Sequence, residues 1–263
     1  MEEFSYKPLI EGMTWSFSRI KSFEDCPYRW YLTYIREKRD DECFYASYGS
    51  FMHSLLADFY EGRKTREDML VSFLTEFRTR VKGPRPQPET VKKYIESGAD
   101  YIRSFVPLDM EIIAVEKELR FEVDGIPFIG FADLVGRNGD GIVLVDHKSH
   151  IIRPRNPFSL KYTLHDKVRD EMLRQLYLYS EGIAEEYGEA PKTLAFNCFR
   201  SGEIVEEAFS EEKFEATKRW AAETVRSIEE TGVFEPKPDY FRCRWICGVS
   251  SHCPYSDADG EGE

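Results

Sequence analysis

Several features that would point to other classes of protein are missing from this 263-residue sequence. No apolar run approaches the roughly 20 residues of a membrane span, and the acidic start Met1-Glu2-Glu3 is unlike a signal peptide. There is no Gly-x4-Gly-Lys-Ser/Thr phosphate loop, no internal repeat and no sign of a second domain boundary. We therefore expect a cytoplasmic protein that folds as a single domain over residues 1–263 and has no nucleotide-driven motor of its own.

Acidic residues outnumber basic residues in this sequence. The chain has 36 Lys and Arg against 48 Asp and Glu, a net charge of −12, which argues against indiscriminate coating of nucleic acid. A local basic groove is still compatible with this balance, because residues 148–174 contain seven basic and three acidic residues, a local charge of +4. Arg153, Arg155 and Lys161 of this stretch are candidates for phosphate-backbone contacts, with an ordinary solvated face as the alternative.

The stretch 116–149 reads as three short strands rich in Val, Ile, Leu and Phe. Turn signals separate them at Asp124-Gly125 and at Asn138-Gly139-Asp140-Gly141. Three strands joined by such short turns predict an antiparallel meander. If the second and third strands pair as a hairpin, the carboxylate of Asp133 lies next to that of Asp146.

The third of these strands ends in Asp146-His147-Lys148. Residues two apart in a strand point to the same face, so Asp146 and Lys148 emerge side by side and His147 points the other way. Two carboxylates suit a hard divalent cation such as Mg²⁺, and a lysine beside it can orient or deprotonate water or offset charge in the transition state of phosphate hydrolysis. The alternative is three exposed side chains at strand ends with no shared site.

Helices are predicted on both sides of this stretch, and two further strands follow it. The predicted helices cover residues 48–60, 65–80, 88–105, 166–187 and 211–231, and the further strands cover 193–199 and 204–209. His53 lies on the apolar side of the first helix, where a histidine is more often a satisfied core residue than a ligand. Gln175 and Tyr179 are four residues apart on a later helix and share a face. Ser16 or Ser18 can cap a short N-terminal helix that ends before Pro27.

The sequence has six cysteines, and three of them cluster near its end as Cys243, Cys247 and Cys253. In a reducing compartment such cysteines are better interpreted as thiols or metal ligands than as disulfides. Cys26, which is also followed by proline, is the best candidate for a fourth ligand, whereas Cys43 and His252 are weaker candidates. Four thiolates suit a [4Fe-4S] cluster or tetrahedral zinc, and the one-plus-three spacing favours iron-sulfur. Cys198 is most simply a core residue.

Taken together, the motifs resemble the iron-sulfur-containing RecB-like nucleases of the PD-(D/E)XK superfamily, the group that includes the AddB nuclease domain and the CRISPR-associated RecB-like exonucleases. The resemblance covers residues 16–255. It rests on motifs that occur in the order of the family: Ser16-x-Ser18-Arg-Ile with Cys26-Pro27, Gly49-Ser-Phe-Met-His53, Gly130-Phe-Ala-Asp133, Asp146-His-Lys148, Gln175 with Tyr179, and the C-terminal cysteines.

The resemblance implies an α/β fold with a restriction-endonuclease-like core, that is, a mixed central sheet flanked by helices, over about residues 45–210. A helical N-terminal elaboration and a C-terminal cysteine cluster would be added to this core. By the same resemblance, Mg²⁺ or Mn²⁺ would be bound by His53, Asp133, Asp146 and the main-chain carbonyl of His147. Lys148 would be catalytic, with Gln175 and Tyr179 positioning the site or the DNA. The four cysteines Cys26, Cys243, Cys247 and Cys253 would hold the [4Fe-4S] cluster, with zinc as the alternative.

The implied activity is a metal-dependent DNA exonuclease that acts on single strands or DNA ends in repair. One alternative is a non-catalytic DNA-binding subunit of a repair or CRISPR-type complex, and another is a structure-specific endonuclease. Intact Asp133, Asp146 and Lys148 favour the enzyme, because a pocket that no longer works should lose at least one of them. A helicase, a recombination protein or a CRISPR protein would be a separate partner.

Overall fold

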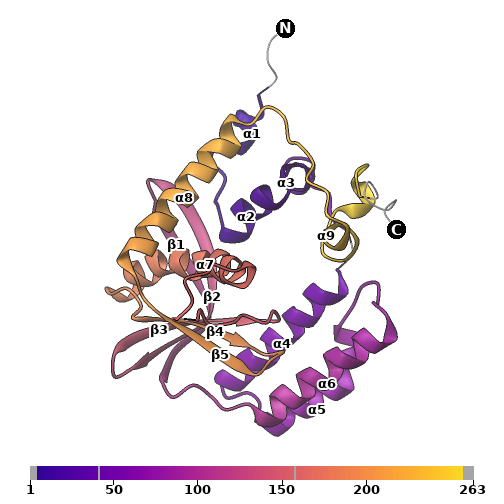
Figure 1. Cartoon of the computed structure of the whole chain (residues 1–263), viewed down its shortest axis with the longest axis vertical. Helices are drawn as coiled ribbons and strands as arrows, with labels where there is room; N and C mark the ends of the chain where they lie inside the picture. Colours follow the sequence, from indigo (N-terminus) through magenta and orange to yellow (C-terminus); the bar gives the residue numbers. More distant parts are fainter. Residues whose placement is uncertain (1–4, 41, 157, 257–263) are drawn as a thin grey trace.

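The computed structural model describes residues 5–40, 42–156 and 158–256. Its centre is a five-stranded sheet with helices on both faces (Figure 1). The strands are β1 (Glu111–Val123), β2 (Ile126–Asn138), β3 (Gly141–Lys148), β4 (Thr193–Cys198) and β5 (Glu203–Ala208), and they lie side by side in that order. The mixed sheet between helices is the α/β architecture expected from the sequence.

The sheet combines two antiparallel parts through one parallel pair. Strands β1, β2 and β3 form the expected antiparallel meander, and β5 pairs antiparallel with β4. Strands β3 and β4 run parallel, and this connection requires a crossover rather than a hairpin. Helix α7 (Leu164–Tyr187) provides that crossover and brings its side chains over the sheet.

The first two strands are longer than the short strands expected from the sequence. Both have 13 residues, and β1 begins at Glu111 rather than at Glu116. The pairing of β1 with β2 shifts register between Ile112 and Ala114, and this irregularity breaks the alternation by which a strand is recognised. The turn between them was identified correctly: Asp124 and Gly125 have φ of +54° and +73°, as a tight two-residue hairpin requires.

The helix boundaries agree with the expected ones within a few residues. In addition to α7, the helices are α1 (Lys7–Ile10), α2 (Phe17–Asp25), α3 (Pro27–Tyr34), α4 (Phe44–Tyr60), α5 (Arg66–Arg80), α6 (Pro88–Ser104), α8 (Glu211–Glu230) and α9 (Tyr240–Trp245), with a 3-10 turn at Ser250–His252. Ser16 caps α2 by accepting from Arg19 N. Helix α4 begins four residues earlier than predicted, and Ser47 in its first turn is buried and donates to the carbonyl of Arg80. None of the described helices is both long and apolar enough to cross a membrane.

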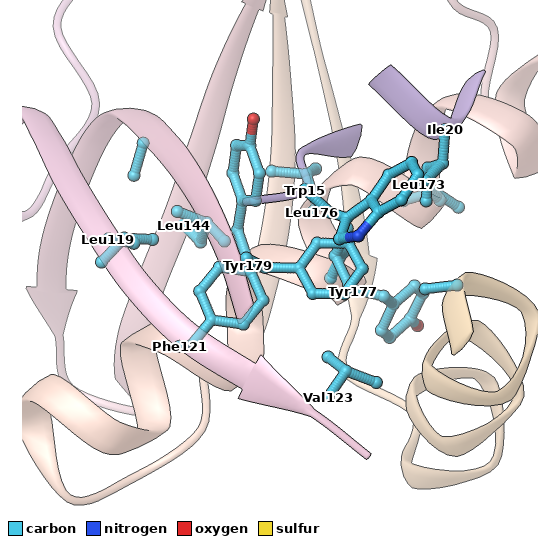
Figure 2. Packing of buried hydrophobic residues seen from close by; sticks show 14 of the residues in the cluster. Trp15, Ile20, Leu119, Phe121, Val123, Leu144, Leu173, Leu176, Tyr177 and Tyr179 are labelled. Carbon is cyan, nitrogen blue, oxygen red and sulfur yellow. The ribbon is translucent and has the colours of Figure 1, made fainter. Parts of the chain in front are cut away.

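One face of the sheet packs against α7 and α8 and against the N-terminal segment. In Figure 2, Leu119 and Phe121 of β1 and Leu144 of β3 lie near Leu176 and Tyr179 of α7. Figure 2 also shows Trp15 and Ile20 in this cluster. This apolar layer holds α7 at a defined height over the sheet, which determines where the polar residues of α7 emerge.

The other face is covered by the end of α4 and the segment that leads into β1. Leu134, Val143, Val145 and Ala195 of the sheet form a small buried group there, against which Tyr60 of α4 packs. A separate aromatic cluster joins α4, α5 and α6 and includes Phe199 just after β4. Helix α4, which carries His53, is therefore fixed against both the sheet and the α5–α6 pair.

The two ends of the chain meet beside α2 and α3. In Figure 1, α9 lies next to α3 although more than half of the sequence separates them. Arg242 Nη1 donates to the carbonyl of Asp25 at 2.8 Å, and the rings of Tyr28 and Tyr255 contact edge to face at 5.1 Å. The segments that carry the first and the last cysteines are thereby brought together.

Candidate metal and active site

The β2–β3 hairpin brings the acidic residues of its two strands together, as the sequence predicted. The last pair of this hairpin is Leu134 of β2 with Val145 of β3. The next residues towards the site are Asp133 on β2 and Asp146 on β3. Asp133 Oδ2 accepts a hydrogen bond from the main-chain N–H of His147 at 2.7 Å. Lys148 Nζ lies 2.7 Å from Asp146 Oδ2, so these two side chains share one face of β3.

His53 of α4 faces the end of this hairpin. Its Nε2 lies 2.8 Å from the main-chain oxygen of His147, and its Nδ1 lies 3.4 Å from Asp133 Oδ1. Because a carbonyl oxygen only accepts hydrogen bonds, Nε2 carries the proton, and a neutral ring turns the lone pair of Nδ1 towards the carboxylate. Two electron-pair donors that face each other require a cation between them, either a second ring proton or a metal ion.

Glu116 of β1 joins this group, although sequence reasoning did not single it out. His53, Glu116 and Asp133 each offer a ligand atom, and these atoms all lie within 4.8 Å of one another. Glu116 has a φ of +47°, a left-handed conformation that costs a non-glycine residue on the order of 1–3 kcal/mol and that tends to occur at functional sites. The strained backbone directs its carboxylate into the cluster.

A signal for Glu116 was present in the sequence. The pairs Val115 with Leu134 and Lys117 with Ala132 set Glu116 opposite Asp133. The turn at Asp124-Gly125 fixes this register, since a two-residue hairpin determines every pair that follows it. Counting outward from the turn would have found Glu116 as the partner of Asp133.

The carboxylates of this site titrate differently. Burial raises the pKa of Asp146 to about 6, although the charge of Lys148 lowers it in part. Burial also acts to raise the pKa of Asp133, but its hydrogen bond with His53 and the charge of that ring hold the pKa below its usual range. The same interaction raises the pKa of His53 against the effect of burial. Asp133 and His53 thus stabilise each other as an ion pair when no other cation is present.

Two side chains of α7 complete the site above the sheet. Lys148 Nζ donates to Gln175 Oε1 at 2.8 Å, and Gln175 Nε2 lies 3.4 Å from the hydroxyl of Tyr179. A Cβ atom on Gly130 of β2 would come within 2.4 Å of the Tyr179 ring, so only glycine leaves room for the tyrosine there. Gln175 and Tyr179 therefore share one face of α7, as their spacing predicted, and Gln175 contacts the lysine directly.

An open groove of about 650 Å³ lies beside the cluster. Its lining includes His53 and Glu116, and Gly49, Ser50 and Ser54 of α4 form part of its wall. Small side chains on this stretch of α4 leave the proposed ligands accessible from the outside. Arg153, Arg155 and Lys161, the predicted phosphate contacts, are exposed on the segment that follows β3 and do not line this groove.

The donor set fits a hard divalent cation. Glu116 and Asp133 offer carboxylate oxygens and His53 offers a nitrogen, and none of these three atoms needs to donate a proton. Asp146 is buried next to this group and has Lys148 as its partner. The main-chain oxygen of His147, which the resemblance offered as a further ligand, already lies against His53 Nε2.

The four cysteines assigned to the cluster come from both ends of the chain and carry free thiols. Cys26 Sγ accepts from the main-chain N–H of Lys237 at 3.3 Å and from that of Arg29 at 3.5 Å. Cys243 Sγ accepts from the main-chain N–H of Asp239 at 3.5 Å. Backbone N–H groups that point at sulfur stabilise negative charge on it, as thiolate ligands need.

The charges of the cluster cysteines also affect the pKa values of neighbouring thiols. Burial raises the pKa of the Cys253 thiol, and the charges of Cys26 and Cys243 raise it further. Burial likewise raises the pKa of Cys247, with added contributions from Cys243 and Cys253. Cys198 is fully buried in the main core, as expected for a packing residue. Among the weaker candidates, His252 lies 3.7 Å from Asp40, and Cys43 precedes α4.

Comparisons with known proteins point to one family. A model of the PD-(D/E)XK nuclease superfamily matches residues 14–257. No curated protein matches the sequence significantly. A solved structure named "Putative exonuclease" from Eubacterium rectale is 13% identical, with a TM-score of 0.52 over 95% of this chain and 91% of that chain. A second structure, SSO0001, is 16% identical over 94% of this chain and 88% of that chain. Its TM-score of 0.35 is too low to support a conclusion about the fold. At such identities the likeness extends to the fold alone.

Proposed function

Because the chain belongs to the PD-(D/E)XK nuclease superfamily, we propose that it is a metal-dependent DNA exonuclease of the RecB-like, iron-sulfur-containing type. Its substrates would be single-stranded DNA or DNA ends. The observation that carries the proposal is the convergence of His53, Glu116 and Asp133 within 4.8 Å, next to the Asp146–Lys148 pair. The name of the E. rectale protein agrees with an exonuclease.

We propose that His53, Glu116, Asp133 and Asp146 hold Mg²⁺ or Mn²⁺, while the main-chain oxygen of His147 accepts from His53 Nε2 and so orients that ring. A divalent ion bound there would polarise the scissile phosphate and lower the pKa of a water molecule. Asp133 and His53 are already oriented for this task by their hydrogen bonds to the two sides of the His147 peptide. Because the oxygen ligands are preorganised, little reorganisation is needed when the ion binds.

Lys148 would be the catalytic base or the electrostatic stabiliser of the transition state. Its ammonium group lies between Asp146 and Gln175, at 2.7 Å and 2.8 Å, so its position does not depend on substrate. From there it can orient the attacking water or offset the charge that develops on the phosphate oxygens. Gln175 and Tyr179 are positioning residues in this scheme, since they hold Lys148.

The cysteines Cys26, Cys243, Cys247 and Cys253 would bind one [4Fe-4S] cluster whose role is structural. They join segments 217 positions apart (243 − 26) at the edge of the molecule, whereas the proposed chemistry lies between residues 53 and 179. A cluster ligated by four thiolates contains no open site for a carboxylate and water. Because the unfolded chain has no such site, binding of the cluster adds to the free energy of unfolding.

The test is digestion of end-labelled linear DNA, single- and double-stranded, with Mg²⁺, with Mn²⁺ and with EDTA. Wild type should degrade the linear strands only when a metal is present, and Lys148→Ala should be severely slowed. Lys92→Ala is a matched control, since Lys92 is exposed on α6 and pairs with Glu96.

Closed circular DNA separates the two enzymatic possibilities. An exonuclease leaves covalently closed circles intact, whereas cleavage of circles at the rate of linear strands would establish the endonuclease instead. Metal-dependent DNA binding without cleavage in any condition would favour the non-catalytic subunit. Processing of long duplexes only after addition of a helicase or recombination protein would identify the kind of partner.

A further inference from the structure

The segment between β3 and α7, residues 149–163, is firmly held at both ends. Lys148 precedes it at the site, and Ile152 is buried in the main core. At its far end Thr163 caps α7 through a capping box with Asp166. Any ligand bound along this segment would therefore lie between Lys148 and the start of α7.

Beyond Ile152 the segment exposes large apolar side chains. Phe158 is 94% exposed, Leu160 is fully exposed and Leu164, at the start of α7, is 74% exposed. Tyr162, also exposed, donates its hydroxyl to Asp170 at 3.0 Å, which leaves its ring face open. Every second residue from 158 to 164 is thus apolar or aromatic and projects into solvent. A concentration of exposed apolar groups in one short segment marks a binding surface.

The same segment carries only positive charge. Residues 149–163 include Arg153, Arg155 and Lys161 and no Asp or Glu, in a chain whose net charge is −12. All three basic side chains are exposed. Positive charge next to exposed aromatic rings fits a polyanionic ligand that also has flat apolar faces.

The segment is continuous with the proposed catalytic site. Arg153 is five residues from Lys148, which limits the separation of their Cα atoms to about 18 Å. Helix α7, which follows the segment, supplies Gln175 to Lys148. Phe131, another exposed aromatic residue, stands two positions before Asp133 on β2.

We propose that residues 149–156 and 158–164 form a binding site for unpaired nucleotides, with the rings of Phe158 and Tyr162 stacking on bases and Arg153, Arg155 and Lys161 contacting phosphates. This inference rests on the proposed nuclease function and names its substrate: a strand whose bases are unpaired. In a duplex the base faces are stacked on one another and only base edges and phosphates are accessible. Exposed rings beside basic residues therefore favour single-stranded over fully paired DNA.

Binding can be measured without cleavage in EDTA, by fluorescence anisotropy of labelled oligonucleotides. The three probes are an oligodeoxythymidylate, an abasic strand of the same length and a blunt duplex. Wild type should bind the oligodeoxythymidylate roughly tenfold more tightly than the abasic strand, given the size of base–aromatic stacking.

Substitutions at Phe158 separate stacking from general apolarity. Phe158→Ala and Phe158→Leu should lose about tenfold in affinity for the oligodeoxythymidylate and little for the abasic strand, whereas Phe158→Trp should retain wild-type affinity. Arg155→Ala should weaken both strands alike and reduce the salt dependence of binding. Val71→Ala, an exposed apolar residue on α5, is the control and should change nothing.

Equal affinity of wild type for the abasic strand and the oligodeoxythymidylate would overturn the inference. Full binding by Phe158→Leu would also overturn it and point to a surface that docks an apolar protein partner. The two proposals fail separately. Cleavage in Mg²⁺ with no effect of Phe158 on either assay leaves the nuclease standing and rejects the base-binding segment. Base-dependent binding without cleavage supports the base-binding segment and rejects the nuclease.

Discussion

Asn197 Nδ2 donates to His147 Nδ1 at 3.0 Å in the interior of the protein, on the side of β3 opposite Lys148. The same nitrogen lies 2.7 Å from the hydroxyl of Tyr101, and the ring of Tyr60 stacks on the imidazole. Burial lowers the pKa of His147 to about 4, so this ring is neutral and Nδ1 accepts. The side chain of His147 is thus anchored while its peptide unit holds Asp133 and His53.

Replacing Asn197 by Ala should weaken metal binding at the proposed site, although Asn197 is not one of the proposed ligands. The substitution leaves a buried imidazole nitrogen without a partner, which costs about 1–3 kcal/mol of stability. Since the His147 peptide then moves more freely, Mn²⁺ affinity should fall by roughly 10–100-fold, as when an outer-shell partner of a metal site is lost. Calorimetric titration with Mn²⁺ and the unfolding midpoint report the two effects. Tyr101→Phe, which keeps the Asn197–His147 bond, is the control, and equal affinities in all three proteins would reject this role.

Glu116→Gln should reduce Mn²⁺ affinity by more than this outer-shell effect, because it removes a charged oxygen donor from the cluster. Glu118→Gln is a matched control two residues along the same strand, where the carboxylate pairs with the exposed Arg120. Titration of both variants with Mn²⁺ checks the expectation. Glu116 is not a ligand if the two variants bind the ion equally well.

Asp133→Ala and Asp146→Ala should each abolish nuclease activity with little loss of fold. Each removes an oxygen ligand from a cation that must contact the scissile phosphate. The end-labelled DNA assay measures the activity, and circular dichroism with thermal unfolding establishes that the variants are folded. Wild-type cleavage by a folded variant would end the assignment.

Lys148→Ala should slow cleavage by roughly 10²–10³ while metal binding at neutral pH persists, by analogy with deletion of a transition-state donor. The side chain contacts Asp146 and Gln175 rather than the His53–Glu116–Asp133 group. Single-turnover rates with saturating Mg²⁺ separate chemistry from binding. A variant that loses metal binding and rate together would assign Lys148 a structural role instead.

Metal affinity should depend on pH through Asp146. Its pKa of about 6 means that the carboxyl is protonated below that pH, and a proton must leave before the ion binds. The second ring proton of His53, whose pKa is raised by the interaction with Asp133 against the effect of burial, must also leave. Affinity should therefore fall as the pH decreases, by up to about tenfold per unit for each proton that is released. In the wild type the charge of Lys148 lowers the pKa of Asp146. In Lys148→Ala this charge is absent, so the fall should begin at higher pH. Mn²⁺ titrations at a series of pH values provide the measurement, and a profile that does not respond to Lys148 would contradict the assignment.

Anaerobic purification should give a brown protein with about four irons per chain. Substituting Cys26, Cys243, Cys247 or Cys253 by Ser should bleach it and lower the unfolding midpoint. Cys198→Ser should keep the colour, since that thiol is buried in the main core. Metal analysis and absorbance spectra decide the matter: stoichiometric zinc in a colourless protein would reject the iron-sulfur cluster, and a quadruple variant of unchanged stability would reject a structural metal altogether.

What the sequence by itself determined is largely local. Turn residues at Asp124-Gly125 and Asn138–Gly141 defined the hairpins, and the register of a short hairpin follows from its turn. That register by itself brings Asp133, Asp146 and Lys148 together, and it indicates Glu116 as well. The helix boundaries were predictable for the same reason, because caps and apolar periodicity lie within a few residues of each other.

The tertiary structure alone decided how distant segments meet. The contact of His53 with the His147 carbonyl spans 94 residues and depends on how α4 packs against the sheet. The left-handed backbone of Glu116 and the Asn197 anchor behind His147 have no local signature, since strain and buried hydrogen bonds are stabilised by surrounding packing. The exposure of Phe158 likewise depends on the tertiary structure, because the packing of other segments decides whether an apolar side chain is buried. The sequence alone does not distinguish a buried apolar residue from an exposed one.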